Sequence, residues 1–397
     1  SWRTEASITE TVAEIALATA ATRFDLAAKR VPAVSERFEF DPAWLEGQGN
    51  TDTTGWLIDP VMFHGVTFTG LEPDTLYAYR IQGEDDKWSP WRQVRTAPAS
   101  GPVEFLYFGD AQNGIRSHVS RMFDTASVVA PEANFMLHAG DLVNKGLDDR
   151  LWAEWFEAGG RLFGRVPSNP VPGNHDKGVG SRDMLTPFWR PTFVLPVESG
   201  LPEVLHEAAY AIRYTPDLHL FAINSSALEF QEQLDWLAGQ LKSSDARWRV
   251  VFMHHPFFSW VGDGIEKPDQ TVKRAQLDAF LAEQDVDLVL TGHRHSYQRA
   301  ESGPDVHTRD KHAPYEVDTV FLVTAMTIKR GTTKVDGWER FSQEREGQIS
   351  LTRWGDDVPL FGVFRIDGDT LSYRAFDAVG DTYDAFTIKK NEQGKKI

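Results

Sequence analysis

The fold is decided by the stretch VEFLYFGD, residues 103–110, in which a short apolar strand pattern ends on a glycine and an aspartate. Similar strand ends, followed by residue types that bind metals, occur at four later places in the chain. The five blocks are Gly109-Asp110, Gly140-Asp141, Gly173-Asn174-His175-Asp176, His254-His255-Pro256 and Gly292-His293-Arg294-His295. Open α/β sheets bind ligands at the carboxyl ends of their strands. The pattern therefore indicates an α/β fold with one shared polar site.

The chain from Val103 onward alternates short apolar strands with amphipathic helices, which is typical of an α/β layer architecture. The pattern predicts strands at Val103 to Phe108, Asn134 to His138, Arg249 to His254 and Val286 to Thr291. It predicts helices at Arg116 to Val129, Asp149 to Phe163, Gln231 to Lys242 and Thr271 to Gln284. Strands return at Val320 to Ala325, Leu360 to Ile366, Thr370 to Phe376 and Asp384 to Lys389. These late strands suggest a second sheet, and hence a β-sandwich flanked by helices.

Residues before about Pro98 favour a separate all-β module. Its expected strands include Val12 to Ala18, Arg37 to Phe40, Met62 to Phe68 and Leu76 to Gln82, separated by turn residues. The stretch from Ala97 to Pro102 is rich in proline, glycine and serine and reads as a linker. We therefore expect two domains, residues 1–97 and residues 98–397.

Composition excludes several classes of function. The formal net charge of −17 argues against a nucleic-acid backbone as the principal partner, because phosphate binding requires clustered Lys and Arg. The absence of cysteine leaves only His, Asp, Glu, Asn and Gln as metal ligands. No apolar run approaches the roughly 20 residues that cross a bilayer, so we expect no membrane association. The chain shows no signal peptide, although it opens at Ser1 and not at Met.

The five blocks contain the ligand types of a two-metal site for phosphoester hydrolysis. Divalent or trivalent cations take carboxylate oxygens and imidazole nitrogens, and one carboxylate can be shared between two ions. His293 and His295 lie two residues apart at a strand end, which places both imidazoles on one side. Asn174 offers a neutral amide oxygen, while His175 is suited to donate to a phosphoryl oxygen. The sequence therefore predicts a dinuclear metal centre.

In this order, the blocks resemble those of the calcineurin-like metallophosphoesterase superfamily. The turn Gly70-Leu71-Glu72-Pro73-Asp74-Thr75, which leads into a strand with alternating tyrosines, resembles the fibronectin type III pattern and points to the purple acid phosphatases. The resemblance implies a four-layer sandwich of two mixed β-sheets flanked by helices, preceded by a fibronectin III-like sandwich. By comparison with such domains, Trp2 at the second position suggests that the first strand is missing. The resemblance also implies a secreted or periplasmic protein.

The resemblance implies metal-binding and catalytic roles for individual residues of this chain. Asp110 and His295 would hold the first metal, Asp141 would bridge, and Asn174, His254 and His293 would complete the second site. Outer-sphere groups would orient phosphate and protonate the leaving oxygen: His175, assisted by Asp176, is the expected general acid, and His255 is the second candidate.

Two positions depart from the purple enzymes. Their second block is Gly-Asp-x-x-Tyr, with a tyrosine that binds iron(III) and gives the colour, but this chain has Asn144 at that place. The first block of the purple enzymes is Gly-Asp-x-Gly, and the wider superfamily often has a histidine ligand at its last position, but this chain has Gln112 there. Either Gln112 or Asn144 could lend an amide oxygen to the first metal, or water could fill the gap. Because the phenolate is absent, we expect two divalent ions, drawn from Mn, Zn, Fe or Mg.

The expected activity is hydrolysis of small phosphomonoesters by attack of a metal-bound hydroxide. The same site acting on phosphodiesters, nucleotides or phosphotriesters is the nearest alternative, and a non-catalytic binding protein is the alternative of another class. The charged loop from Lys329 to Asp357 would give the site a preference for monoesters over diesters, because its cations are able to pair with the second negative charge of a monoester. An equally good reading is a solvated loop, neutralised by its own acidic residues. Its cations are Lys329, Arg330, Lys334, Arg340, Arg345 and Arg353.

Overall fold

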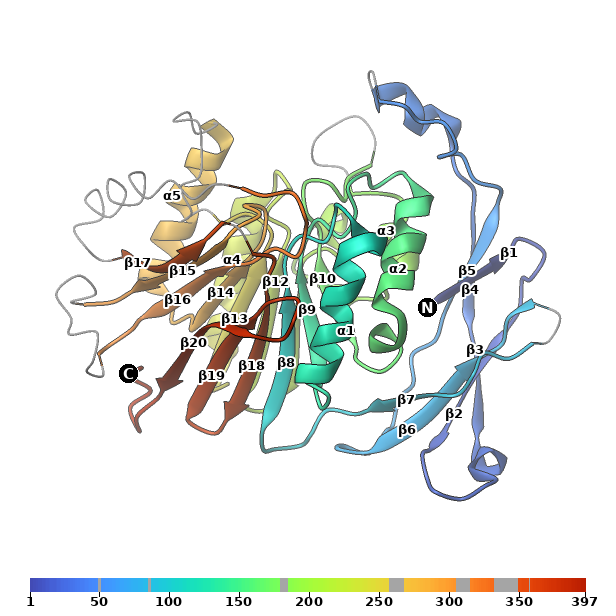
Figure 1. Cartoon of the computed structure of the whole chain (residues 1–397), viewed down its shortest axis with the longest axis horizontal. Helices are drawn as coiled ribbons and strands as arrows, with labels where there is room; N and C mark the ends of the chain where they lie inside the picture. The colour runs from blue at the N-terminus through green and yellow to red at the C-terminus, as the bar shows by residue number, and fades with distance from the viewer. Residues whose placement is uncertain are drawn as a thin grey trace.

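The computed structural model describes residues 1–48, 51–84, 87–178, 185–256, 268–304, 315–331, 349–356 and 358–397. From Val103 onward the chain forms four layers, in which two mixed β-sheets face each other and helices cover both outer sides (Figure 1). This is the fold class that the sequence predicted. Within the described residues, no helix has the length and apolar character needed to cross a membrane.

The first sheet has six strands in the order β10-β9-β8-β18-β19-β20. Its three parallel strands are β8 (Val103–Phe108), β9 (Phe135–Ala139) and β10 (Ser168–Val171). Its antiparallel strands are β18 (Phe361–Asp367), β19 (Thr370–Phe376) and β20 (Thr382–Lys389). The helices α1 (Ser120–Val129) and α2 (Asp149–Phe163) cover its outer face (Figure 1).

The second sheet has seven strands in the order β11-β12-β13-β14-β16-β15-β17. The parallel strands β12 (Leu218–Ile223), β13 (Trp248–Met253), β14 (Leu288–Thr291) and β16 (Thr319–Val323) form its centre. The antiparallel strands are β11 (Tyr210–Thr215), β15 (Tyr297–Ser302) and β17 (Ile349–Gly355). The helices α4 (Phe230–Ser243) and α5 (Pro268–Glu283) pack on its outer side.

The core has three parts because the central strands bury both of their faces. On β8, Phe105 and Tyr107 point between the two sheets, whereas Leu106 and Phe108 point toward α1 and α2. The Tyr107 hydroxyl accepts a hydrogen bond from the Thr291 amide at 2.9 Å and so ties the two sheets together. Double burial explains why residues 103–108 are apolar at every position except Glu104.

The late strands divide between the sheets, which differs from the expectation that they form a second sheet. Of the four expected late strands, only the one matching β16 lies in the second sheet, whereas β18, β19 and β20 extend the first, with β18 pairing antiparallel to β8. Val363 pairs with Leu106 in that register. An apolar alternation identifies a strand but does not specify its partner, because both sheets offer the same apolar interior.

The N-terminal domain contains two antiparallel sheets (Figure 1). One has the order β1-β5-β4 and consists of β1 (Trp2–Glu5), β5 (Val61–Gly65) and β4 (Val34–Phe38). The other has the order β3-β2-β6-β7, from β3 (Lys29–Pro32), β2 (Val12–Leu17), β6 (Leu76–Ile81) and β7 (Arg92–Arg95). Residues 96–102 then connect β7 to β8.

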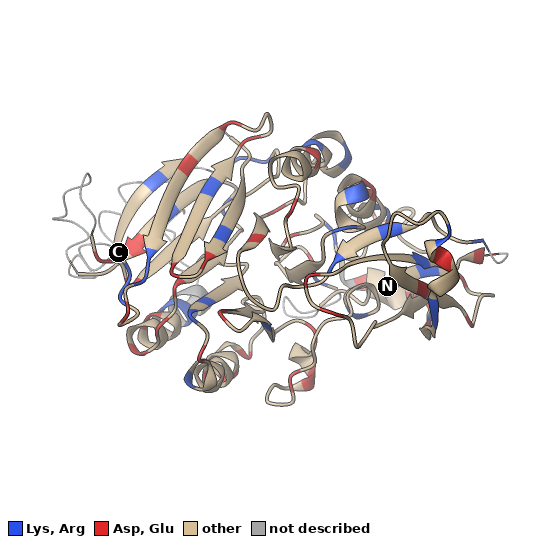
Figure 2. Cartoon of the chain, turned by 90° about the horizontal axis from the view of Figure 1, so that it is seen from below, with Lys and Arg blue, Asp and Glu red and all other residues tan. Residues whose placement is uncertain are grey.

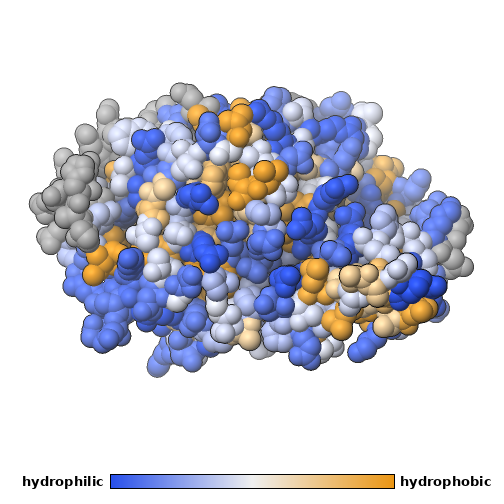
Figure 3. Space-filling view, turned by 60° about the horizontal axis from the view of Figure 1, so that its bottom comes forward, coloured by the Kyte–Doolittle hydropathy of each residue, from blue (hydrophilic) through white to orange (hydrophobic). Residues whose placement is uncertain are grey.

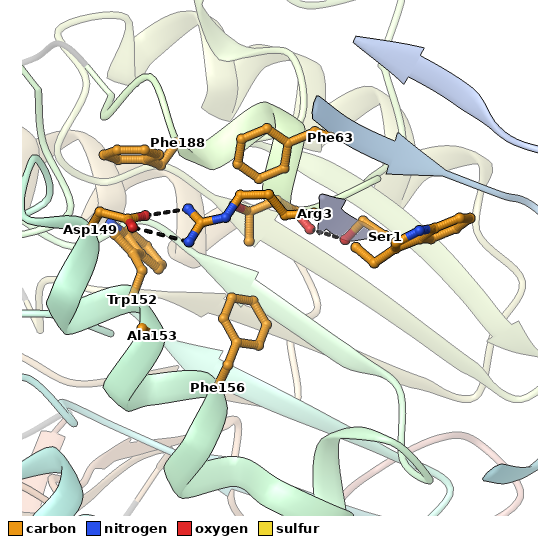
Figure 4. Close-up of a pocket in the computed structure, with 10 residues that line it drawn as sticks. Ser1, Arg3, Phe63, Asp149, Trp152, Ala153, Phe156 and Phe188 are labelled. Atoms are coloured by element: carbon orange, nitrogen blue, oxygen red, sulfur yellow. Dashed lines mark hydrogen bonds and ion pairs between the residues drawn. The ribbon is translucent and has the colours of Figure 1, made fainter. Parts of the chain in front are cut away.

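The two domains share one apolar core along α2 and the short helix α3 (Trp189–Thr192). Phe38 of β4 stacks on Phe188 with ring centroids 4.9 Å apart. Beside this contact lies a cavity of about 290 Å³ whose walls include Phe156 (Figure 4). The Arg3 guanidinium crosses it to pair with both carboxylate oxygens of Asp149, at 2.5 and 3.0 Å. The N-terminal domain is therefore docked against the helices of the first sheet.

The surfaces in view carry mixed charge and scattered apolar area. Lys and Arg alternate with Asp and Glu along the elements seen from below (Figure 2). Apolar side chains reach the surface in separate areas between hydrophilic ones (Figure 3).

Candidate metal centre

The five sequence blocks meet where β8, β9, β10, β13 and β14 end. Asp110 follows β8, Asp141 follows β9 and His254 follows β13, and all three side chains are buried. The Asp110 carbonyl accepts from the amides of Met326 and Thr327 at 3.0 and 2.8 Å, which connects this end of the first sheet to the segment after β16. Neighbouring parallel strands from both sheets thus bring distant residues to one place.

One group of donor atoms, called the second group because it corresponds to the expected second metal, gathers around Nε2 of His254. Asn174 Oδ1 lies 3.1 Å from it, His293 Nδ1 3.2 Å and Asp141 Oδ2 3.3 Å. The other ring nitrogen of His254 lies 2.8 Å from the carbonyl oxygen of Ala139 and donates to it. That hydrogen bond leaves Nε2 as the free ligand nitrogen.

Another group, called the first group because it corresponds to the expected first metal, gathers around the side chain of Gln112. Its amide nitrogen lies 2.6 Å from His295 Nε2, 3.2 Å from Asp141 Oδ2 and 3.5 Å from Asp110 Oδ2. His295 Nε2 is also 2.9 Å from Asp110 Oδ2. The amide of His293 donates to the other Asp110 oxygen at 2.5 Å, so the carboxylate is held in a fixed orientation.

Asp141 belongs to both groups through the same atom, Oδ2. Its other oxygen, Oδ1, accepts from the amide of His175 at 2.7 Å. One oxygen is therefore held by the backbone, and the other faces both groups. This is the arrangement expected of a bridging carboxylate.

The donor spacing fits two cations. Two atoms that each lie about 2.0–2.2 Å from one ion are roughly 3.0–3.5 Å apart. Most of the separations given above fall within or close to that range. Asn174, His254 and His293 would hold one ion, Asp110, His295 and Gln112 the other, and Asp141 both.

The backbone around these residues is strained. Five described residues other than glycine have a positive φ, and three of them are the candidate ligands Asp141 (54°), His293 (71°) and His295 (51°). Left-handed conformations at non-glycine residues cost about 1–3 kcal/mol each, and they cluster at functional sites. Holding the donors in one cluster therefore has a conformational cost.

The electrostatics of the cluster suit a cation. Although burial acts to lower it, the carboxylates of Asp141 and Asp110 raise the pKa of His254 to about 9. Although burial acts to raise it, His254 lowers the pKa of Asp141 to about 2. Burial lowers the pKa of His293 well below its usual value, which keeps that imidazole neutral and able to bind metal.

His175 and Asp176 have different partners. The His175 ring donates through Nδ1 to the carbonyl oxygen of Asn144 at 2.9 Å, which leaves Nε2 to meet a substrate. The Asp176 carboxylate accepts from the amides of Leu142, Val143 and Gly173 at 3.2, 3.1 and 2.9 Å. Burial, followed by the charge of Asp141, raises the pKa of Asp176 to about 7. Through these hydrogen bonds Asp176 connects the segment after Asp141 to the segment that begins at Gly173.

His255 lies beside the second group, with its ring centroid 4.5 Å from that of His293. One donor atom each from His254, His255 and His293 lies within 4.8 Å of the others. The Ser225 hydroxyl accepts from the His255 amide at 2.9 Å, and its oxygen lies 3.0 Å from His255 Nδ1. Burial lowers the pKa of His255 well below its usual value.

Sequence reasoning missed Ser225 and Lys273. Lys273 of α5 donates to the carbonyl of Ser225 at 3.0 Å and thereby fixes the loop that holds His255. A signal was present, because Asn224 and Ser225 follow the apolar strand β12 as the other blocks follow theirs. Lys273, in contrast, has no local signal and is identified only by the fold.

The charged loop is described only at its ends. Lys329 is exposed, and the amide of Gly331 donates to the His295 carbonyl at 3.0 Å, so this end borders the first group. Arg353 lies on β17, 4.6 Å above the Tyr383 ring. Lys334, Arg340, Arg345 and Asp357 lie outside the described residues.

Comparison with known proteins agrees with this fold. Residues 103–297 match the family described as Calcineurin-like phosphoesterase, and residues 1–96 match the family described as Purple acid Phosphatase, N-terminal domain. An uncharacterized protein of Mycobacterium tuberculosis is 27% identical over 285 residues, 63% of this chain and 53% of its own. Purple acid phosphatase 21 of Arabidopsis thaliana is 26% identical over 261 residues, 63% of this chain and 56% of its own. The chain thus spans about half the length of these relatives.

A solved structure has the same fold. The purple acid phosphatase PPD1 from yellow lupin (Lupinus luteus) seeds superposes with a TM-score of 0.71 and 18% identity, over 97% of this chain and 70% of that one. The fold and the matched region define a calcineurin-like phosphoesterase domain. With its N-terminal part included, the chain combines a calcineurin-like phosphoesterase domain with a purple acid phosphatase N-terminal domain.

Proposed function

We propose that this chain is a dinuclear metal-dependent phosphoesterase that hydrolyses small phosphomonoesters. The observation that carries the proposal is the sharing of Asp141 Oδ2 by two groups of ligand atoms at strand ends. Two adjacent cations would neutralise a phosphoryl group, orient it and activate water at neutral pH. Family membership supports the same class of reaction.

The chain's own residues would orient the substrate and supply the proton. His175 has Nδ1 engaged with the Asn144 carbonyl, so its Nε2 is the nitrogen able to protonate a leaving oxygen. Asp176, held by three backbone amides, would position the loop that carries His175 and not move a proton itself. His255, oriented by Ser225, would donate to a phosphoryl oxygen.

The test compares His175→Ala and Asp141→Ala with the purified wild-type chain. We expect His175→Ala to lower kcat for p-nitrophenyl phosphate by about 10²–10⁴-fold with its metal content retained. Asp141→Ala should lose bound metal as well as activity, because both ions share that carboxylate. The exposed residues His118 and Asp124 give matched controls, His118→Ala and Asp124→Ala. Unchanged turnover in both site variants would refute the assignment.

Monoester preference is a separate part of the proposal. Lys329 is exposed next to the segment that contacts His295, and it is suited to pair with the second negative charge of a monoester. We expect kcat/KM for p-nitrophenyl phosphate to exceed that for bis-p-nitrophenyl phosphate, and Lys329→Ala to reduce only the former. The reverse preference would assign the site to diesters.

The ions are proposed to be divalent. Asn144 replaces the tyrosine that binds iron(III) in the purple enzymes, so the as-isolated protein should lack an intense visible charge-transfer band. Such a band would contradict the proposal. A protein with no bound transition metal, and no turnover after Mn²⁺ or Zn²⁺ is added, would instead support a non-catalytic binding role. From the family resemblance we also propose export from the cytoplasm, which cell fractionation would test.

A further inference from the structure

The first group of donor atoms is incomplete without the amide of Gln112. Asp110, Asp141 and His295 provide two carboxylates and one imidazole, and the position of the missing tyrosine is taken by Asn144. The backbone carbonyl of Asn144 binds His175. Gln112, in contrast, is 2% exposed and reaches three of the candidate ligand atoms with its amide.

The two ends of this amide have opposite surroundings. Its nitrogen faces two carboxylate oxygens and an imidazole nitrogen, whereas its oxygen, Oε1, is buried and has no hydrogen-bond partner among the described residues. A half-turn about the last side-chain bond exchanges the two atoms without moving the rest of the residue. The oxygen would then join three other electron-pair donors, an arrangement that a cation between them stabilises.

We infer that Gln112 supplies the missing ligand of the first metal with its amide oxygen, and that the resulting oxygen-rich site selects Mn²⁺ or Mg²⁺. This inference rests on the proposed two-metal site. The first site would have three oxygen donors and one imidazole, whereas the second has the imidazoles of His254 and His293 with two oxygens. Carboxylate and carbonyl ligands suit Mg²⁺ and Mn²⁺, while imidazole suits Zn²⁺ and Fe²⁺. The two sites should therefore prefer different ions.

The experiment measures metal binding and does not depend on activity. Bound metal is first removed from the full chain with a chelator, and one equivalent of Zn²⁺ is added to fill the second site. The chain is then titrated with Mn²⁺, and the electron paramagnetic resonance signal of free Mn²⁺ reports how much Mn²⁺ remains unbound. The wild-type chain should bind one Mn²⁺. Gln112→Leu should still bind its Zn²⁺ but bind Mn²⁺ at least tenfold more weakly. Asn144→Ala, the matched amide control, should bind Mn²⁺ like the wild type.

Gln112→His keeps a ligand at the same position and tests the selectivity. With imidazole in place of the amide, Zn²⁺ should displace the bound Mn²⁺ at a concentration at least tenfold lower than in the wild type. This variant decides the matter if Gln112→Leu fails to retain Zn²⁺ or to melt cooperatively.

Two results would overturn the inference: Mn²⁺ binding by Gln112→Leu within twofold of the wild type, or an equal loss in Asn144→Ala. Two bound ions without turnover of any phosphate ester would instead refute the proposed function and leave the ligand assignment standing.

Discussion

Gly140 is one of the glycines at which the site leaves no room for a side chain. Its φ is +79°, and a Cβ atom there would lie 2.7 Å from His254 Nδ1 and 2.8 Å from Gly173 Cα. Gly140→Ala should therefore displace His254 and Asp141, lowering Zn²⁺ affinity at least tenfold and stability by about 2–4 kcal/mol. Isothermal titration and urea unfolding measure the two effects.

Gly368→Ala is the control for backbone strain alone, because Gly368 has φ +54° with no atom within 4 Å of an added Cβ. It should cost about 1 kcal/mol and leave metal binding unchanged. Equal losses of affinity in the two variants would show that crowding at Gly140 has no part in the effect.

The ligand types were readable from the sequence, but the choice between Gln112 and Asn144 was not. Each strand-end block was visible because apolar runs stop abruptly at Asp, Asn or His. Gln112 and Asn144 both lie within three residues of a candidate ligand, so spacing cannot rank them. Only the path of the backbone, which turns the Asn144 carbonyl to His175 and the Gln112 side chain to His295, separates their roles.

At the scale of the element, β9 carries a buried histidine that makes the fold sensitive to acid. His138 packs among Phe108, Phe123, Trp155 and Phe163, and its Nε2 has no partner among the described residues. Burial lowers the pKa of His138 to about 3, below the unfolded value of about 6.5. The contribution of this neutral histidine is fully present above pH 6.5 and is lost as the pH falls from 6.5 toward 3. Each pH unit in that window costs about 1.4 kcal/mol.

His138→Phe should remove this dependence. When the pH falls from 7 to 5, the free energy of unfolding of the variant should decrease by about 2 kcal/mol less than that of the wild type. Urea unfolding in the presence of a chelator measures this difference. The exposed residue His118 serves as the control, since His118→Phe should leave the pH dependence unchanged. Parallel pH profiles for His138→Phe and the wild type would contradict the prediction.

The positions of helices and strands were more predictable from the sequence than the pairing of the strands into sheets. The expected strand at residues 103–108 and the expected helix at residues 149–163 match β8 and α2 in full, because one is apolar except at Glu104 and the other has a clear helical period. The sheet to which each strand belongs was not predictable in the same way. For example, β18 follows β8 by more than 250 residues in the sequence and yet pairs with it in the sheet. Pairing over such a separation depends on the assembled core and leaves no local sequence signal.

At the scale of the whole molecule, the N-terminal domain is joined to the calcineurin-like phosphoesterase domain by a continuous core. Phe38 of β4 contacts Phe188 across the boundary and Phe63 within its own sheet, with centroids 4.9 and 5.6 Å apart. The same cluster includes Trp152 and Trp155 of α2. A core without a break at the boundary implies that the two domains unfold together.

Phe38→Ala should therefore destabilise the whole chain and not only its first domain. Truncating this ring, which is 8% exposed, should cost about 3–5 kcal/mol and lower the midpoint of a single calorimetric transition. Val34, at the other end of the same strand, is 81% exposed, so Val34→Ala should change stability by less than about 0.5 kcal/mol. Two separate transitions in the Phe38→Ala variant, with the later one at the wild-type temperature, would show instead that the phosphoesterase-like domain folds without its neighbour. A single, lowered transition would mean that the metal centre depends for its stability on aromatic packing in the N-terminal domain.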